Sequence, residues 1–407
     1  MRILILGLNY APEPVGIGPY TRGLAEGLVE RGHAVSVIAG KPYYPQWRPY
    51  AGQAKGITTA VENGVTVTRV PHYIPATPSA ARRLLHHASF AASALRPDAQ
   101  VAGAAPDLVF TIAPSLMSVP VAALAAYRAR APLWLHVQDF EVEAAFATGL
   151  VGKGGRLRSG ALAAEERILR MADHASSISP QMCAKLVDKG LAPEQVYQLR
   201  NWSTTQFDFA SSDSAAYRSR WNLGDRKVAL YSGNIANKQG LDVVIEAARL
   251  LRNRTDIAFV ICGEGPNRAN LQAQADGLDN VQFHDLQPAE QMGSFLSLAS
   301  VQLLPQIMGA ADLVLPSKLT NMLASGRPVL ATAEPGTGLY AEVEGCGTLT
   351  PPGDPAGMAE GLVRLIDDPD GSARYGDAAR RRAQERWSKD SILDALHARL
   401  CSLQPAA

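Results

Sequence analysis

Short apolar runs alternate with amphipathic stretches along most of the chain. Arg2–Leu8 and Leu108–Ile112 are long enough for buried strands, and apolar residues recur four positions apart in the helix expected from Pro19 to Gly32. This alternation is typical of parallel βαβ units and predicts an α/β fold. In the first half we also expect strands at Val35–Ala39, Val65–Val70, Leu133–Val137, Ala175–Ser179 and Val196–Leu199, and helices at Ser115–Arg130 and Gly155–Met171.

A polar interruption divides this pattern. The periodicity stops around Asn201–Asp213 and the alternation resumes at Val228. We therefore expect two doubly wound domains, residues 1–203 and 204–385, with a ligand buried in a cleft between their strand ends. The second half predicts strands at Val228–Ser232, Ile257–Cys262, Val281–Phe283, Val301–Leu304, Pro328–Ala331 and Gly347–Leu349, helices at Gly240–Leu251, Arg268–Ala275 and Pro288–Leu298, and further helices from Pro355 onward.

The segment Leu304–Thr332 joins two of these strands through a loop and a short helix. Pro316 suits a first helical turn, Ser317 can cap it, and Gly326 can end it in the left-handed conformation. The small residues 309–311 leave room for a ligand beside the helix start, which favours phosphate. The alternative is an ordinary, well-capped βα loop.

A second candidate phosphate site follows the strand Val228–Ser232. Gly233 lets a ligand approach the strand end, and Lys238 is a loop cation just before the helix expected from Gly240. A lone loop lysine is more often simply solvated. The turn Gly263-Glu264-Gly265-Pro266 is open to the same two interpretations, as a ligand loop or only a tight turn.

The glycine-bearing loop after the first strand fails as a dinucleotide site. Gly16 and Gly18 lie far beyond the strand end, Thr21 stands where the third glycine belongs, and no acidic residue ends the second strand. A nicotinamide dehydrogenase is therefore disfavoured. The free N–H groups at the helix start near Gly18 would suit the distal end of a charged donor.

Composition narrows the function classes. Among 407 residues, 47% are hydrophobic and 19% charged, and the net charge of +1 lacks the basic excess of a nucleic-acid binder. The four cysteines are far apart and show no paired spacing typical of zinc or redox sites, so we expect buried, free thiols in a reducing compartment. The opening apolar run is too short for a signal peptide, and no later run reaches 18 apolar residues. We expect a cytoplasmic protein.

Taken together, these motifs resemble the GT-B glycosyltransferases of family four. The resemblance rests on the glycine and Lys-x-Gly after a strand, the Gly-Glu-Gly-Pro turn, and the small-residue loop before Gly-Arg-Pro-Val. Within that family, the chain is similar to the colanic-acid-type capsule glycosyltransferases. The segments that carry this similarity are NYAPEPVGIGPYT, KPYYPQW (Lys41–Trp47), LHVQDFEVEAA (Leu135–Ala145) and GAADLVLPSKLTNMLASG.

The resemblance implies two Rossmann-like domains facing across a deep cleft, with a C-terminal helix (386–407) that crosses back to the first domain. It implies metal-independent, retaining transfer of a sugar from a GDP- or UDP-linked donor to a lipid-linked oligosaccharide, with no separate cofactor. Lys238 matches the lysine that holds the donor diphosphate, and Leu313 and Val314 match the amides that cap it. Gly16, Gly18, Gly233, Gly263, Glu264, Gly309 and Ala310 complete the expected donor loops.

The chain departs from the family at three positions. Asn234 stands where many relatives have arginine, so the remaining positive charge must come from Lys238, from backbone dipoles or from another lysine such as Lys318. Asn321 replaces the second of two glutamates, and its amide can still bind ribose hydroxyls. Leu313 replaces the first glutamate, and the adjacent Asp312 or its loop could hold the sugar instead.

Ionisable groups at the end of Leu133–Val137 are the candidate catalytic residues. His136 and Asp139 would contact the sugar or orient the acceptor hydroxyl, although a strand-end histidine is usually structural. Asp368-Pro369-Asp370 has metal-like spacing, but we interpret it as a turn between helices. Two other classes stay open: a sugar-nucleotide epimerase of the same fold, and a two-lobed sugar-binding protein, which would need an export signal.

Residues 79–96 are predicted to form an amphipathic helix. Helical spacing gathers Ala81, Leu84, Leu85, Ala88, Ala92 and Leu95 on a face expected to pack on the sheet. Arg82, Arg83, His86 and His87 gather on the other face, with Phe90 among them. A basic face with one aromatic residue would suit an anionic membrane surface. The alternative is a solvated face with Phe90 covered by a loop.

Overall fold

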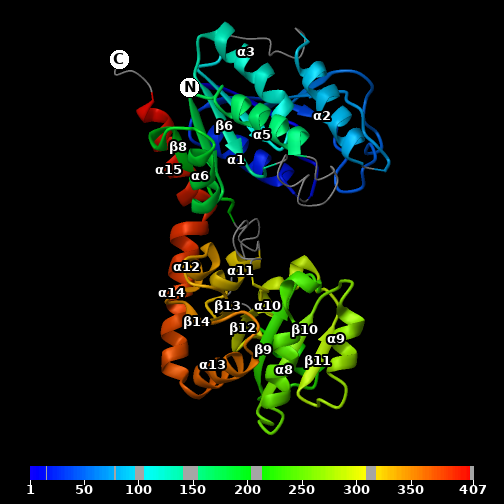
Figure 1. Cartoon of the computed structure of the whole chain (residues 1–407), viewed down its shortest axis with the longest axis vertical. Coiled ribbons are helices and arrows are strands. Elements are labelled where there is room, and N and C mark those ends of the chain that lie inside the picture. The colour runs from blue at the N-terminus through cyan, green and yellow to red at the C-terminus, as the bar shows by residue number, and fades with distance from the viewer. Residues whose placement is uncertain are drawn as a thin grey trace. The chain divides into compact units, whose positions relative to one another are not determined.

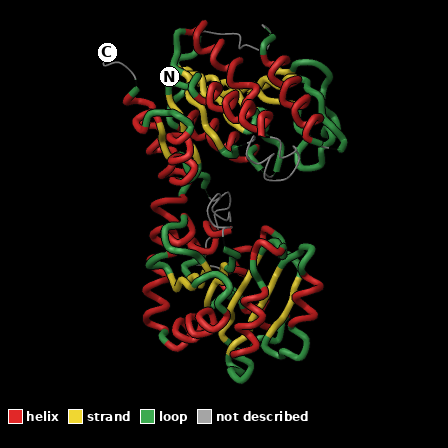
Figure 2. Tube along the Cα trace, in the orientation of Figure 1, coloured by secondary structure: helices red, strands yellow, loops and turns green. Residues whose placement is uncertain are grey.

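The computed structural model shows two compact α/β units (Figure 1). The first comprises Met1–Thr204 with Ile392–Ala407, and the second comprises Thr205–Ser391. Each unit contains one sheet flanked by helices (Figure 2). The structure describes residues 1–14, 16–77, 79–96, 105–140, 155–202, 213–308 and 318–403.

The first unit is built on an eight-stranded sheet with the order β3-β4-β2-β1-β5-β6-β7-β8. All neighbouring strands are parallel except β3 and β4, which form an antiparallel hairpin through Asn63 and Gly64. The predicted strands are confirmed, whereas β3 was not expected. The strands are β1 (Arg2–Gly7), β2 (Ala34–Gly40), β3 (Thr58–Glu62), β4 (Val65–Val70), β5 (Leu108–Ala113), β6 (Leu133–Val137), β7 (His174–Ser177) and β8 (Val196–Gln198).

Helices cover both faces of this sheet because alternate residues of its strands are apolar on each side. Ile3 and Ile5 pack with α1 (Gly18–Glu30) and α15 (Lys389–Ser402), and Leu4 and Leu6 belong to the cluster on the opposite face. The helices of that opposite face are α2 (Ala80–Ala94), α3 (Val119–Ala129), preceded by the turn η1 (Leu116–Ser118), α5 (Gly155–Leu169) and α6 (Pro180–Asp188). A short turn, η2 (Pro193–Gln195), leads into β8.

Helix α15 contributes four buried apolar residues to the first unit. Leu393 lies so near α1 that a Cβ on Gly27 would be 2.2 Å from its Cδ1. His33 Nε2 lies 2.8 Å from His397 Nδ1, and Arg31 pairs with Asp394 at 2.7 Å. The α15 side chains that join this core are Ile392, Leu393, Leu396 and Leu400.

The second unit has a six-stranded, fully parallel sheet with the order β11-β10-β9-β12-β13-β14. Its strands are β9 (Lys227–Ser232), β10 (Ile257–Cys262), β11 (Val281–His284), β12 (Val301–Leu304), β13 (Val329–Thr332) and β14 (Gly347–Thr350). All six were predicted, and each residue of β10 is buried, as expected of a strand covered on both faces.

One face of this second sheet packs on α8 (Asp242–Leu250), α9 (Arg268–Gln274) and α13 (Pro355–Asp367). The other packs on α7 (Ala215–Arg220), α10 (Met292–Ser297), α11 (Lys318–Ala324), α12 (Gly338–Val343) and α14 (Pro369–Trp387), with the turn η4 (Ala289–Gln291) before α10. Gly240 does not begin a helix as expected. It has φ 62° after the turn η3 (Asn237–Gln239), and α8 starts at Asp242. Asp368 caps α14 by accepting the Gly371 N–H at 2.9 Å, so Asp368-Pro369-Asp370 is the start of a helix and not the separate turn that was expected.

The predicted orientation of helix α2 is wrong. Phe90 and His86 are fully buried, whereas Leu84 and Leu85 are 58% and 55% exposed. Burial lowers the pKa of the neighbouring His87 to about 3, so this imidazole is neutral at neutral pH and packs like an apolar ring. His86, His87 and Phe90, which were assigned to the solvent side, are thus packed, whereas Arg82 and Arg83 on that side are exposed. Among the described residues, no helix is long and apolar enough to cross a membrane.

Candidate functional site

The loops after β9 and β10 pack backbone against backbone at the carboxyl edge of the second sheet. The Gly233 N–H donates to the Cys262 carbonyl (2.9 Å), and the Ile235 N–H donates to the Glu264 carbonyl (2.8 Å). A Cβ on Gly263 would lie 1.8 Å from the Gly233 carbonyl oxygen. Gly233 has φ 134°, a conformation that favours glycine. The contact between loops accounts for Gly263, and a donor contact there stays a prediction.

Lys318 brings a positive group to the same edge. It begins α11, and its Nζ lies 3.8 Å from the centroid of the Tyr231 ring. The same Nζ would lie 3.6 Å from a Cβ on Gly233. Asn234, the residue that replaces arginine, accepts the Tyr231 hydroxyl on its carbonyl at 2.6 Å. Asn321 follows one turn further along α11. The structure therefore brings Lys318 close to Gly233 and to Tyr231, whose hydroxyl is bonded to Asn234.

Glu264 belongs to a network of opposite charges. Its carboxylate pairs with Arg268 at the start of α9, and Arg268 also binds Asp285 at 2.7 Å. The hydrogen bond with Asp285 is the main cause that raises the pKa of Arg268. Glu264 could therefore bind a donor hydroxyl only while sharing or exchanging this cation. The sequence interpretation missed Arg268, although its spacing four residues after Glu264 is a signal for a helical ion pair.

Several expected donor residues lie outside the described residues. Lys238 is placed in the turn η3, but its side chain is not described. The segment 309–317 is also outside them, and it holds the expected donor residues Gly309, Ala310, Asp312, Leu313 and Val314.

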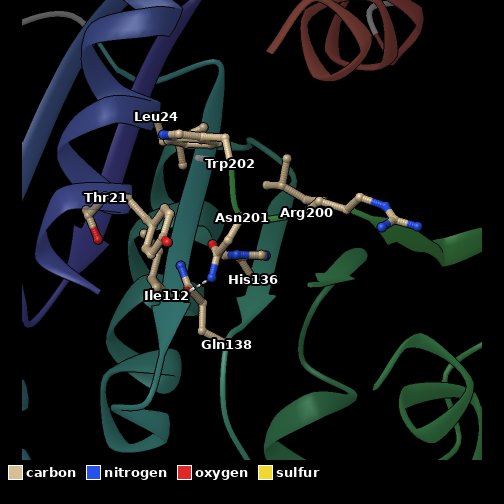
Figure 3. Close-up of a pocket in the computed structure, with 10 residues that line it drawn as sticks. Thr21, Leu24, Ile112, His136, Gln138, Arg200, Asn201 and Trp202 are labelled. Carbon is tan, nitrogen blue, oxygen red and sulfur yellow. Dashed lines mark hydrogen bonds between the residues drawn. The ribbon is translucent and has the colours of Figure 1, made fainter. Parts of the chain in front are cut away.

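In the first unit, His136 lines a small pocket at the ends of the central strands (Figure 3). Its Nδ1 lies 2.9 Å from the Ser176 hydroxyl, and its side chain is only 3% exposed. Burial lowers the pKa of His136 to about 4, so the ring is neutral at neutral pH. Asn201 donates to Gln138 across the pocket at 3.0 Å. The pocket is lined by Tyr20, Thr21, Leu24, Ile112, His136, Gln138, Leu199, Arg200, Asn201 and Trp202.

The volume of this pocket limits what it can hold. Its empty volume is about 240 Å³, and this value includes space open to solvent, so the enclosed part is smaller than a site that buries a nucleotide-sized ligand. Trp202 closes one side, with its ring 5.6 Å from that of Tyr20 in an edge-on arrangement. Asn201 and Trp202 were not predicted as pocket residues, because both stand at the start of the polar interruption.

Asp139 follows β6 and keeps an exposed side chain. Desolvation by the surrounding protein raises the pKa of its carboxyl, against the lowering effects of the Phe140 N–H and of the positive charges of Arg83 and Lys185. Asp139 therefore faces two cations from helices α2 and α6, which makes this strand end attractive to an anion as well as to a hydroxyl.

A buried glutamate organises the loop that carries Gly16 and Gly18. Glu13 Oε1 accepts the N–H groups of Tyr43 and Tyr44, each at 3.0 Å, and burial raises the pKa of its carboxyl. A Cβ on Gly18 would lie 3.0 Å from the Glu13 Cβ, and a Cβ on Gly16 would lie 3.1 Å from the Tyr44 ring. Packing thus accounts for both glycines, and their donor role stays a prediction. Glu13 was missed, although it lies within NYAPEP.

Comparison with known proteins agrees with this layout. The family of glycosyl transferases group 1 matches residues 213–382, and the glycosyl transferase 4-like domain matches residues 15–202. The chain is 39% identical to WcaI, a colanic acid biosynthesis glycosyl transferase of Escherichia coli K12, over 97% of this chain and 98% of WcaI. It is 32% identical to an alpha-D-kanosaminyltransferase of Streptomyces kanamyceticus, over 51% of this chain and 54% of that protein.

Solved structures show the same fold at low sequence identity. HepE from Anabaena, in complex with UDP, matches with a TM-score of 0.67 at 17% identity, covering 99% of this chain and 100% of HepE. WaaG, a glycosyltransferase involved in lipopolysaccharide biosynthesis, matches with a TM-score of 0.60 at 16% identity and the same coverage. The chain therefore belongs to the group 1 glycosyltransferases, with a glycosyl transferase 4-like first domain and the GT-B fold expected from its motifs.

Proposed function

We propose that this glycosyltransferase moves a hexosyl group, with retention at the anomeric carbon, from a GDP- or UDP-linked donor to a lipid-linked oligosaccharide in exopolysaccharide synthesis. The observation that carries the donor side is the placement of Lys318 over the Tyr231 ring and beside Gly233, at the edge of the second sheet. The similarity to WcaI over nearly the whole chain supports a polysaccharide pathway.

On this proposal, the donor diphosphate lies against the loops of the second unit. Lys238 and Lys318 supply positive charge, and the amides of Leu313 and Val314 cap the phosphates. Fixed donors aimed at the charge that grows on the leaving diphosphate are the largest available catalytic contribution. We propose that they do this without a metal ion. Asn321 binds the ribose, and Asp312 holds the transferred sugar.

On the first unit, Asp139 acts on the sugar or acceptor. Its exposed carboxylate, within the electrostatic influence of Arg83 and Lys185, can position the acceptor hydroxyl, while a donor phosphate oxygen accepts the proton. His136 is buried and neutral, and its role is to position the pocket wall at the strand end. This assigns direct contact to Asp139 and indirect support to His136.

A lipid-linked acceptor requires the enzyme to work at the inner face of the cytoplasmic membrane. Support comes from α2, where Leu84 and Leu85 are exposed next to the exposed residues Arg82 and Arg83. Leucines beside arginines suit an anionic bilayer surface. This surface replaces the Phe90 face expected from the sequence.

The membrane contact is tested by co-sedimentation with phosphatidylglycerol vesicles. Leu84→Ser/Leu85→Ser and Arg82→Glu/Arg83→Glu should leave the protein in the supernatant, and the arginine effect should shrink at high salt, because salt screens charge attraction. Arg128→Glu, on the exposed end of α3, is the matched control and should still sediment. Wild-type protein that does not sediment at low salt would contradict the proposal.

The reaction is tested by incubating purified protein with a panel of UDP- and GDP-sugars, with and without a lipid extract containing diphosphate-linked oligosaccharides. Transfer into the lipid fraction, with an anomeric configuration in the product that matches the donor by NMR, is the expected result. Conversion of the donor to its epimer without acceptor would instead identify an epimerase. Sugar binding with no turnover of any donor would identify a sugar-binding protein.

A further inference from the structure

Lys318 has an unusual environment for a lysine. Its Nζ is buried and, in the part of the chain that the structure describes, has no hydrogen-bond partner. The group lies over the Tyr231 ring and against the backbone of Gly233. The Tyr231 hydroxyl is engaged by the Asn234 carbonyl at 2.6 Å and is directed there. An amine in this position has an aromatic face below it and, among the residues that the structure describes, no anion to balance a charge.

This environment disfavours the charged form of the amine. A buried ammonium loses its hydration, and attraction to an aromatic ring offsets only part of that loss. Burial accordingly lowers the pKa of Lys318 to about 7. Tyr231 is the titratable group that faces Lys318 among the described residues, and burial raises the pKa of its phenol, so it too stays neutral. No charge on β9 therefore compensates Lys318.

We propose that Lys318 stands largely uncharged in the empty site above neutral pH and takes up a proton from solvent when the donor diphosphate binds. The inference rests on the proposed function, because it assigns the diphosphate to this edge. The bound anion supplies the missing counter-charge and stabilises the ammonium form. Lys318 then becomes a cation only when the ligand binds. It does so beside Gly233, whose neighbour Asn234 replaces the permanently charged arginine of many relatives.

This coupling fixes how donor affinity depends on pH. If binding raises the pKa of the amine well above 7, one proton is taken up per donor once the solution pH exceeds the pKa that the amine has in the free site. We expect uptake of about half a proton at pH 7 and nearly one at pH 8, and an affinity that falls about tenfold per pH unit above pH 7.

The measurement is isothermal titration calorimetry of the full chain with UDP-glucose and GDP-mannose between pH 6.5 and 8.5. Repeating each titration in buffers of different ionisation enthalpy gives the number of protons exchanged. The diphosphate of a sugar nucleotide is esterified at both ends and keeps its charge across this range. Any proton taken up therefore belongs to the protein.

Two variants separate Lys318 from other titrating groups. Lys318→Met keeps an unbranched side chain over Tyr231 but removes the amine. It should bind more weakly than the wild type at pH 6.5, show no proton uptake, and approach the wild-type affinity as the pH rises to 8.5. Lys227→Met removes an exposed lysine from the opposite end of β9 and should reproduce the wild-type proton number and pH slope.

The inference would be overturned if the wild type bound the donor without proton uptake, or if the donor affinity of Lys318→Met fell with pH as steeply as that of the wild type. Either result would leave the donor site in place. Absence of binding by both sugar nucleotides, and by UDP and GDP, would overturn it together with the proposed donor function. The two failures are distinct, because only the second removes nucleotide binding.

Discussion

Adding one methyl group at Gly263 should disrupt the donor edge of the second unit. A Cβ on this residue would lie 1.8 Å from the Gly233 carbonyl oxygen. Because the obstacle is backbone, no side-chain rotation can relieve it, and the two loops must separate by at least about 1 Å. That movement strains the bonds from Gly233 to Cys262 (2.9 Å) and from Ile235 to Glu264 (2.8 Å).

We expect Gly263→Ala to lower the free energy of unfolding of the second unit by about 2–4 kcal/mol, from overpacking plus weakened hydrogen bonds. Because Gly233 and Asn234 move with the loop, nucleotide-sugar affinity should also fall. Urea unfolding followed by circular dichroism measures the first effect, and calorimetric titration with UDP-glucose or GDP-mannose measures the second.

Gly160→Ala is the matched control for the same chemical change. Gly160 lies in α5, where a Cβ would meet nothing within 4 Å. This substitution should stabilise the protein by about 0.5–1 kcal/mol, since alanine is the better helix former. If Gly263→Ala were as stable as the wild type, the close packing of the two loops would be refuted.

Three further outcomes are expected. Lys238→Ala should weaken sugar-nucleotide binding by about 1.5–3 kcal/mol, as for a sheltered charged contact; unchanged affinity in a titration would exclude that contact. Asp139→Asn and His136→Ala should lower turnover while nucleotide affinity stays near wild type, and a parallel loss of stability in both would favour purely structural roles. Stability should fall as pH drops from about 6.5 toward 3, because the unfolded chain binds protons that His72 and His87, with pKa values of about 3, refuse when folded. Urea midpoints at pH 7 and pH 5 check this, with a shallower slope expected in His87→Gln.

The strands were predictable because most of them are continuous apolar runs. Such runs are typical of strands in a sheet that is covered by helices on both faces. Strand β3 was missed because its residues are exposed or half-buried, so Thr58–Glu62 carries no core signal. The better signal was Asn63-Gly64, a pair typical of a tight hairpin, with φ angles of 49° and 81°.

The error on α2 has a physical origin in histidine. A helical projection treats His86 and His87 as polar, yet neutral imidazoles can join a ring cluster, and the His86 ring lies 4.6 Å from that of Tyr43. The choice of face thus depended on protonation, which a sequence pattern does not encode. The position of Lys318 over Tyr231 was equally hidden, because it arises from tertiary packing between a strand and a distant helix.

The return of α15 to the first unit means that this unit is not one continuous stretch of the gene. A chain cut after residue 203 would lose Leu393, Leu396 and the His397 partner of His33, and would open the apolar face of α1 to water. Such a fragment would associate through that face or unfold. Exchange of the first unit between relatives therefore has to move two separated segments together. Recombination at a single point would join the sheet of one protein to a C-terminal helix that was selected to pack on another sheet.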